Sequence, residues 1–208
     1  MNSLVLLVGA SGVAREVIAA GMTGIVGILD DDRNRHGTQI GGVPVRGPIE
    51  AAAERSELLL VCIGDGTARR AVVRRLRDAG VGEDRFTTFV APSARIGASS
   101  SVGAGSIVLD GVVVTADARI GRHVVVMPTC VITHDDVIGD WATLAAGVVL
   151  GGGVRVGEAA YLGMHASVRQ GGVIGADAVV GMGAVVLDAV PAAQTWAGVP
   201  ARPLGVLA

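Results

Sequence analysis

The chain has 208 residues, enough for one large domain or two small ones, and half of them are apolar although only 2% are aromatic. All 17 basic residues are arginine and the formal net charge is −2, so charge gives no case for a nucleic-acid partner. No apolar run reaches the roughly 20 residues of a membrane-spanning helix. Two cysteines form neither a disulfide framework nor a metal cluster. We therefore expect a cytoplasmic protein that binds no membrane, nucleic acid or metal.

Residues 1–90 alternate between strand and helix patterns. Continuous apolar runs predict buried strands at 3–9, 25–32 and 57–65. The segments between and after them predict helices at 13–22, 48–56 and 67–80, the last ending at Gly80. Residues 85–92 close the region. This β-α-β alternation implies a parallel sheet with right-handed crossovers.

From residue 96 onward an aliphatic residue recurs at every sixth position, without an insertion. The positions are Ile96, Val102, Val108, Val114, Ile120, Val126, Ile132, Ile138, Leu144, Leu150, Val156, Leu162, Val168, Ile174, Val180 and Val186. Strand residues an even number apart can share a face, so a period of six keeps one aliphatic side chain inward on every short strand. Such repeats stack into a β-solenoid whose core is a column of aliphatic side chains, too narrow for aromatic rings.

Two other positions of the repeat carry information. The residue two places before the aliphatic is small in 11 of 16 repeats, which suits a cramped corner; the exceptions are four valines and Asp136. Glycine often follows the aliphatic directly, where we expect it to supply positive φ at the turns. A β-sandwich would instead show turn signals every 8–12 residues or so, and a disordered segment would not keep the register.

An unbroken hexapeptide repeat after a small β-α-β region resembles the sugar acetyltransferases of the sialic-acid and UDP-4-amino-sugar type. The motifs that carry this resemblance are VGASGVAREV (8–17), ILDDD (28–32), IGDGTARR (63–70), APSARIG (91–97), ITHDDVIGD (132–140) and WAGVPAR (196–202). The resemblance implies a Rossmann-like, nucleotide-sugar-binding α/β domain over 1–91. A left-handed parallel β-helix acyltransferase domain with a C-terminal cap would follow over 92–208.

His134 is the candidate general base. An imidazole titrates near neutrality and can take a proton from an amine or hydroxyl that attacks a thioester. Asp135 could orient the ring or raise its basicity, and the resemblance implies these roles for the pair. Asp136 stands at a normally small inward position, where burial is costly unless the carboxylate is hydrogen-bonded. We therefore expect a local distortion at this corner.

The turns of the N-terminal region are candidates for binding the nucleotide sugar. Backbone N–H groups where a helix begins can hold phosphate, although the spacing is not a G-x-G-x-x-G fingerprint and a plain tight turn remains an alternative. Acidic residues after the second strand could bond a base or ribose, or merely end the strand. An arginine after the third strand could meet phosphate. The candidates are Gly9, Ser11, Gly12, Val13, Asp30, Asp31, Gly64, Asp65 and Arg69. Many relatives have histidine at the position of Val13.

The resemblance also places a CoA-binding groove along the solenoid. Its candidate residues are Thr143, Gly152, Met164, His165, Gly181, Met182 and Arg202. Thr143 stands where one branch has a second histidine, and Met127 replaces a polar residue of some relatives. His123 and His165, where they do not touch a ligand, are expected to be solvated turn residues. Trp141 is expected to pack rather than to react.

The function expected from this resemblance is acetyl transfer from acetyl-CoA to the amine of a nucleotide-linked amino sugar. It would proceed directly in a ternary complex, in a homotrimer with active sites between subunits. One alternative is an O-acetyltransferase that acts on a sialic-acid-like sugar. Another is an inactive nucleotide-sugar-binding scaffold, which the departures at Val13, Met127 and Thr143 favour slightly. A nicotinamide-dependent enzyme is disfavoured because the dinucleotide fingerprint is absent.

Overall fold

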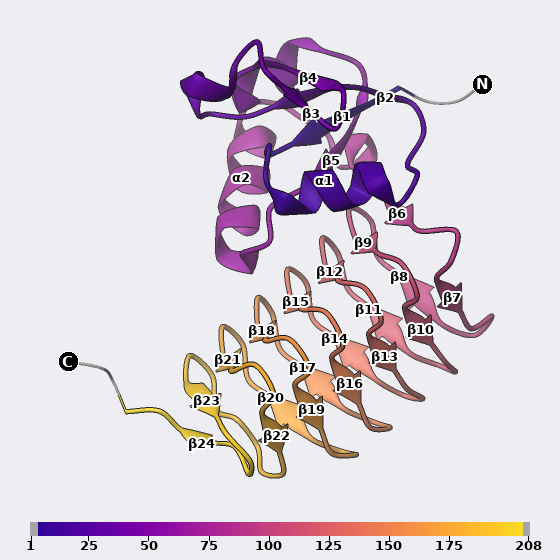
Figure 1. Cartoon of the computed structure of the whole chain (residues 1–208), viewed down its shortest axis with the longest axis vertical. Coiled ribbons are helices and arrows are strands. Elements are labelled where there is room, and N and C mark those ends of the chain that lie inside the picture. Colours follow the sequence, from indigo (N-terminus) through magenta and orange to yellow (C-terminus); the bar gives the residue numbers. More distant parts are fainter. Residues whose placement is uncertain (1–3, 206–208) are drawn as a thin grey trace.

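A computed structural model describes residues 4–205 and shows a compact α/β part at one end of a long solenoid (Figure 1). The α/β part is built on a five-stranded sheet with the strand order β3-β4-β2-β1-β5. The strands are β1 (Val5–Val8), β2 (Ile25–Leu29), β3 (Gln39–Ile40), β4 (Val43–Gly47) and β5 (Leu58–Val61). The pairs β1–β2 and β1–β5 are parallel, as predicted. Strand β4 was not predicted, and it pairs in parallel with β2. The antiparallel pairing of β3 with β4 was not predicted.

Two helices, α1 (Gly12–Ala19) and α2 (Gly66–Asp78), cover opposite faces of this sheet. Alternate residues of β1 point to opposite faces, so Leu7 packs with α1 and Leu6 packs with α2. Gly80 has φ 89° just after α2, as expected for a glycine that ends a helix. The helix expected at 48–56 is instead the 3₁₀ helix η2 (Ile49–Glu54), and two further 3₁₀ turns are η1 (Arg33–Arg35) and η3 (Glu83–Arg85).

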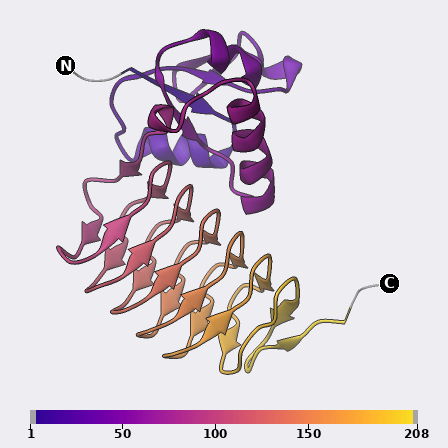
Figure 2. The same ribbon diagram turned by 180° about the vertical axis from the view of Figure 1, so that it is seen from behind.

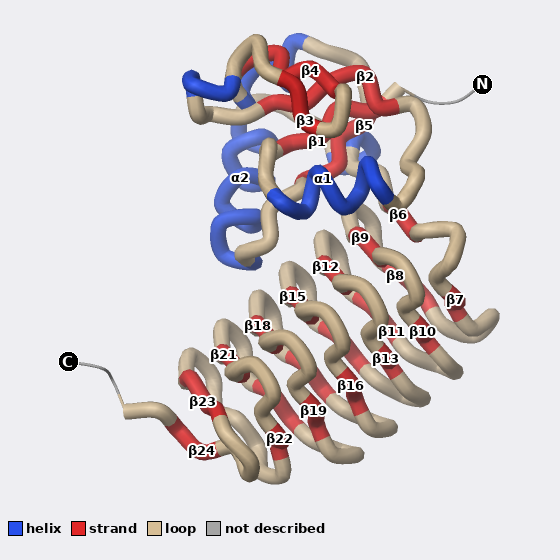
Figure 3. Tube along the Cα trace, in the orientation of Figure 1, coloured by secondary structure: helices blue, strands red, loops and turns tan. Residues whose placement is uncertain are grey.

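The solenoid is a parallel β-helix of two-residue strands, which Figure 3 shows as short strand segments separated by turns. Its strands are β6 (Phe89–Val90), β7 (Arg95–Ile96), β8 (Ser101–Val102), β9 (Ile107–Val108), β10 (Val113–Val114), β11 (Arg119–Ile120), β12 (Val125–Val126), β13 (Val131–Ile132), β14 (Val137–Ile138), β15 (Thr143–Leu144), β16 (Val149–Leu150), β17 (Arg155–Val156), β18 (Tyr161–Leu162), β19 (Ser167–Val168), β20 (Val173–Ile174), β21 (Val179–Val180), β22 (Val185–Val186), β23 (Thr195–Ala197) and β24 (Arg202–Pro203).

These strands form three sheets of eight, six and five strands, and from β6 to β19 each strand pairs in parallel with the strand 18 residues further on. A coil therefore has three corners. The His134 corner is the set of turns that joins the six-stranded to the five-stranded sheet. The Trp141 corner joins the five-stranded to the eight-stranded sheet, and the His165 corner joins the eight-stranded to the six-stranded sheet.

The predicted hexapeptide register is confirmed. Each of the sixteen aliphatic residues is the second residue of its strand, and from Val108 onward all of them are buried in one continuous core. The first two, Ile96 and Val102, are partly buried and pack against the same core. Stacking therefore gives the solenoid a single aliphatic column, as the sequence indicates.

The expected reason for the glycines that follow the aliphatic residues is wrong. Positive φ occurs two residues later, for example at Asp135 (φ 63°) and Gly147 (φ 74°). The glycines directly after the aliphatics instead allow neighbouring coils to approach closely. A Cβ on Gly97 would lie 1.7 Å from the Thr115 carbonyl oxygen, and a Cβ on Gly139 would lie 2.7 Å from the Glu158 nitrogen.

The α/β part lies against the eight-stranded sheet, near β6, β9, β12 and β15 (Figures 1 and 2). Phe89, Ile107 and Val125 on that sheet share a hydrophobic cluster with Val13 and Val17 of α1. Between residues 4 and 205, no helix is both long enough and apolar enough to cross a membrane.

Candidate active site

His134 and Asp135 form a hydrogen-bonded pair at the His134 corner. The Nδ1 atom of His134 lies 2.8 Å from an Asp135 carboxylate oxygen, and both side chains are about two-thirds exposed, at 67% and 66%. The hydrogen bond to Asp135 raises the pKa of His134. It also favours the tautomer with the proton on Nδ1, which leaves the Nε2 lone pair free to accept a proton.

The other side of the imidazole faces the next coil at Gly152. A Cβ on Gly152 would lie only 2.3 Å from His134 Nε2, so glycine makes room for the ring. The Gly153 N–H donates to the His134 carbonyl oxygen at 2.8 Å, which ties the two coils together. Gly152 was a candidate from the sequence, and the structure brings it against the candidate base.

Asp136 is fully buried, and its carboxylate accepts two backbone hydrogen bonds. Oδ2 accepts from Thr133 N and Oδ1 from Val154 N, both at 2.7 Å. Burial raises the pKa of Asp136 to about 6, although these hydrogen bonds oppose the rise. The Thr133 N–H does not reach the Leu150 carbonyl oxygen, which accepts from the Thr133 hydroxyl at 3.0 Å instead. The distortion expected at this corner is therefore present, and sequence reasoning missed the part played by Thr133.

His123 is not the solvated turn residue that the sequence indicated. It is fully buried at the Trp141 corner, where its ring stacks on Trp141 with centroids 4.4 Å apart and meets the edge of Phe86. Neither ring nitrogen has a hydrogen-bond partner among the described residues. Burial lowers the pKa of His123 to about 3. Trp141 packs, as expected.

The His165 corner carries several of the CoA candidates. His165 is exposed with φ 57°, and its ring lies against Gly147 of the preceding coil. Met164 and Met182, one coil apart, are 48% and 72% exposed. A Cβ on Gly181 would lie 2.7 Å from Ala197 Cβ, so this glycine allows the terminal segment to pack closely.

Arg202 lies near the end of the described chain, on β24. Its guanidinium is 3.0 Å from an Asp188 carboxylate oxygen, and both side chains are more than half exposed. Such an exposed ion pair is weak, so it leaves Arg202 able to exchange partners.

The loop between β1 and α1 is held by side chains from neighbouring strands. Gly9 has φ 100°, and the Ser11 hydroxyl accepts from Val13 N and donates to the Cys62 carbonyl oxygen at 2.6 Å. An Asp30 oxygen accepts from Ala10 N at 2.6 Å. Gly12 is exposed, whereas Val13 is only 4% exposed. The Asp30 carboxylate therefore holds the loop between β1 and α1 in place.

Two other acidic candidates make structural contacts. Asp31 accepts from Ile49 N and forms an ion pair with Arg75 at 2.6 Å, and these contacts lower the pKa of Asp31 although its partial burial opposes them. Asp65 caps α2 by accepting from Ala68 N at 2.7 Å. Both carboxylates remain exposed.

Arg69 and Thr143 need correction, because both are buried between the α/β part and the solenoid. Arg69 is fully buried, and its guanidinium donates to the Trp141 carbonyl oxygen at 2.6 Å and to the Gly64 carbonyl oxygen at 3.1 Å, among other backbone groups. The Thr143 hydroxyl donates to Gly64 O at 2.7 Å and accepts from Arg69. Both side chains are buried and bonded within the chain, and together they fix the Gly64 loop on β15.

The candidate residues fall on two sides of the solenoid. The loops around Gly9, Asp30 and Gly64 belong to the part that covers the eight-stranded sheet, whereas the His134 corner is the vertex opposite that sheet (Figure 1). One chain therefore does not bring the base and the sugar-binding candidates together.

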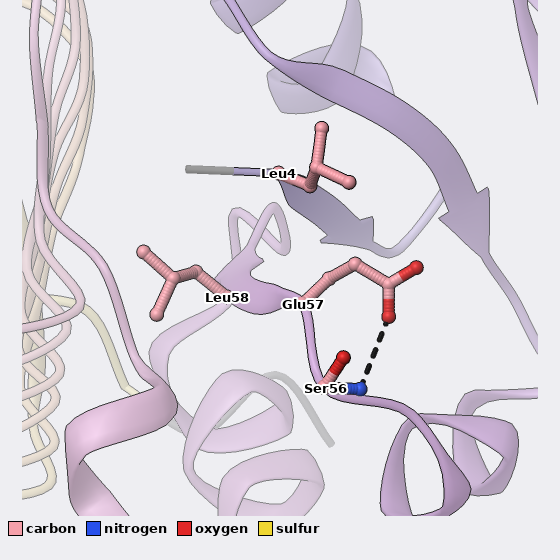
Figure 4. Close-up of a pocket in the computed structure, with 4 residues that line it drawn as sticks. All are labelled: Leu4, Ser56, Glu57 and Leu58. Carbon is pink, nitrogen blue, oxygen red and sulfur yellow. Dashed lines mark hydrogen bonds between the residues drawn. The ribbon is translucent and has the colours of Figure 1, made fainter. Parts of the chain in front are cut away.

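A shallow hollow of about 350 Å³ lies elsewhere, at Leu4, Ser56, Glu57 and Leu58 (Figure 4). It sits where β1 and β5 begin, at the other end of these strands from Gly9 and Gly64. Across residues 4–205, no three histidine, cysteine or acidic side chains are grouped to hold a metal ion.

Comparison with known proteins adds to this geometry. The family model "bacterial transferase hexapeptide (six repeats)" matches residues 117–152, which include His134. A search of curated proteins gave no significant match. Among solved structures, a histidine-to-asparagine variant of perosamine N-acetyltransferase from Caulobacter crescentus, in complex with CoA and GDP-perosamine, is 34% identical. The match covers 99% of this chain and 98% of that one, with a TM-score of 0.89.

Two further solved structures are similar to this chain. The acetyltransferase domain of PglB from Neisseria gonorrhoeae FA1090, in complex with acetyl coenzyme A, is 30% identical over 98% of this chain and 100% of that one, with a TM-score of 0.87. WeeI from Acinetobacter baumannii AYE is 24% identical over 98% and 100% of the two chains, with a TM-score of 0.70, and supports the fold alone.

The fold, the hexapeptide repeat and the His134 corner together define a hexapeptide-repeat transferase of the left-handed β-helix class. More narrowly, the chain belongs to the family of sugar N-acetyltransferases that includes perosamine N-acetyltransferase and PglB. It is therefore an acetyltransferase, as the motifs of the sequence indicate.

Proposed function

We propose that the protein transfers the acetyl group of acetyl-CoA to the amine of a nucleotide-linked amino sugar, with His134 as general base. The observation that carries the proposal is the geometry of the imidazole. Asp135 holds Nδ1 at 2.8 Å, and Nε2 lies against Gly152, where no Cβ competes for the space. The structural relatives support the substrates, because perosamine N-acetyltransferase was crystallised with CoA and GDP-perosamine and PglB with acetyl coenzyme A.

The reaction needs one proton acceptor and one site for negative charge. The acceptor amine attacks the thioester carbonyl carbon, and Nε2 takes the proton that the amine loses. The negative Asp135 carboxylate stabilises the imidazolium that forms. The carbon–sulfur bond then breaks, and the imidazolium returns the proton to the CoA sulfur. We assign the Gly152 N–H to the developing oxyanion, because the Gly153 N–H already donates to His134 O.

We further propose that residues 1–91 form a Rossmann-like nucleotide-sugar-binding domain and residues 92–208 the acyltransferase domain. The order β4-β2-β1-β5, with helices on both faces, supports this assignment. The Gly9–Gly12 loop would hold the diphosphate through backbone N–H groups where α1 begins. The exposed Asp31 and Asp65 carboxylates would bond the sugar or base. Val13 is buried beside this loop, so an apolar side chain stands at the position where many relatives have histidine.

We propose a homotrimer as the active form. The base and the sugar-binding loops lie on opposite sides of one solenoid, so a complete site needs a second copy of the chain. The six-stranded sheet beside the His134 corner supports such a contact, because Val113, Val131, Val149 and Val185 point outward from it. Acetyl-CoA would then lie between the His134 corner of one subunit and Met164, His165, Gly181 and Met182 of another. Arg202 would be near its phosphates.

The test is thiol release from acetyl-CoA in the presence of UDP-, dTDP- and GDP-linked amino sugars, with free sialic acids as hydroxyl acceptors. We expect release with a nucleotide-linked amino sugar and its loss in His134→Ala, with CoA binding retained. Release only with hydroxyl acceptors would overturn N-acylation in favour of O-acylation. The same enzyme should sediment as a trimer.

The buried, unpaired thiols of Cys62 and Cys130 suit a cytoplasmic location.

A further inference from the structure

The position two residues before each inward aliphatic residue has a recurrent hydrogen-bonding pattern when it is polar. The Ser106 hydroxyl donates to the Gly121 carbonyl oxygen and accepts from Val124 N, both at 2.9 Å. Ser100 makes the same two bonds to the next coil at 3.0 Å, and the Cys130 thiol donates to the Ala145 carbonyl oxygen at 3.1 Å. Each of these side chains uses one donor and links two coils at a corner.

Asp136 occupies this position in the coil of His134, and an ionised carboxylate has no proton to donate. It keeps the accepting half of the pattern, from Val154 N. Its second oxygen turns back instead and accepts from Thr133 N. Elsewhere the equivalent N–H donates to the next coil, as Met127 N does to Leu144 O at 2.9 Å.

The Thr133 hydroxyl compensates for this change. It donates to Leu150 O at 3.0 Å, the acceptor that the backbone N–H has left. The ladder between β13 and β16 accordingly has one paired position, Val131 with Val149, whereas the ladders on either side have two. The residue before His134 and the coil that carries Gly152 are thus both held through the Thr133 and Asp136 side chains.

We propose that Thr133 and Asp136 form a clamp that positions the His134 imidazole against Gly152, and that protonation of Asp136 releases it. The clamp acts through the backbone, so both are positioning residues; this role rests on the proposed function of His134. A protonated Asp136 would have the donor that Ser106 has, and could bond Gly151 O while Thr133 N returns to Leu150 O.

The charges around Asp136 are few. His134 and Asp135 lie in its own turn, and Asp117 faces the His134 corner from the preceding coil. The corner of the following coil, 151–154, has three glycines and a valine. Burial raises the pKa of Asp136 to about 6, so the clamp would open as the pH falls through that value. Opening of the clamp would lower the rate at acid pH, and protonation of His134 itself would lower it further.

The experiment uses nuclear magnetic resonance to follow the His134 ring from pH 4.5 to 9 in the intact protein, with assignment from His134→Asn. We expect two inflections in the native protein, one from the imidazole and one near pH 6 from Asp136. Asp136→Cys should lose the second inflection and keep its fold, because Cys130 occupies the equivalent position one repeat earlier. Asp117→Asn, which removes a neighbouring charge but no clamp contact, should keep it.

Turnover supplies the second readout. With the same acceptor, log kcat should fall with decreasing pH below pH 6 in both enzymes. Its slope against pH should be one unit steeper for the native enzyme than for Asp136→Cys. At neutral pH we expect Asp136→Cys and Thr133→Val to lower kcat about 10- to 100-fold, because misplacement of a base by about 1 Å has that effect, with little change in the KM for acetyl-CoA. Thr133→Val also serves if Asp136→Cys does not fold.

The outcomes separate the two proposals. A single inflection in the native protein, or equal kcat and pH profiles in native and variant enzymes, would overturn the clamp even if the protein is active. Two inflections without turnover on any acceptor would support the clamp and count against the proposed function.

Discussion

Gly152→Ala tests the geometry of the site with the smallest possible change. The added Cβ would lie 2.3 Å from His134 Nε2, about 1 Å closer than the 3.4 Å at which ordinary contact begins. The imidazole is two-thirds exposed, so solvent rather than packed side chains lies beside it and it would give way by about 1 Å. A displacement of that size costs about 100-fold in rate, or about 2.7 kcal/mol in the activation barrier. We therefore expect kcat to fall about 100-fold with little loss of stability.

The assay is steady-state thiol release at saturating acetyl-CoA, with melting temperatures of both proteins measured alongside. The matched control compares His134→Ala with the double variant; because the ring is gone there, Gly152→Ala should change neither the Kd for acetyl-CoA nor the melting temperature. The backbone itself accepts alanine here, because Ala116 and Ala146 occupy the equivalent position in other turns. A kcat of Gly152→Ala within two-fold of native would refute the argument, as would a loss of acetyl-CoA affinity on Gly152→Ala in the His134→Ala background.

Three other changes follow from the described contacts. Asp135→Asn should lower the pKa of His134, so the acid limb of the kcat profile should move to lower pH; an unmoved limb would exclude this role. Arg69→Met should lower the free energy of unfolding in urea by about 3 kcal/mol or more, because it leaves several buried carbonyl groups unpaired; a loss below 1 kcal/mol would contradict this. His123 binds its proton less readily folded (pKa about 3) than unfolded (about 6.5), so stability should fall as the pH drops from 6.5 toward 3, by up to about 1.4 kcal/mol per unit. His123→Phe should flatten that dependence between pH 7.5 and 4.5, and an unchanged slope would exclude His123 as its source.

The solenoid could be predicted from the sequence almost completely, because one aliphatic position per six residues fixes both the strand and the side that faces inward. The repeat also places His134 near a corner, whereas the roles expected of the His134–Asp135 pair came from the family resemblance of its motif. In contrast, the β3–β4 hairpin was missed because β3 has only two residues and Gly41, Gly42 and Pro44 interrupt the apolar pattern.

Long-range contacts explain the other differences. Nothing local distinguishes Arg69 from the exposed arginines of α2, and its burial depends on backbone groups more than 50 residues away. His123 looked like a solvated turn residue because the equivalent positions at the other two corners, such as Asp135 and His165, are exposed. At the Trp141 corner the packing of α2 and Phe86 covers it. Thr133 was missed because its role exists only together with Asp136.

The coils of the solenoid are evenly spaced along its axis, so the number of coils between two residues sets the axial distance between them. Each coil advances the chain by one interstrand spacing, about 4.8 Å. In the proposed homotrimer, one coil added or removed between β6 and β13 would shift the proposed base, His134, by that distance relative to the proposed sugar-binding loops of the neighbouring subunit. That shift exceeds the reach of a proton transfer, so under this proposal the number of repeats before His134 could not change without loss of turnover. Repeats beyond the proposed acetyl-CoA site would carry no such constraint, so the solenoid could vary in length at that end.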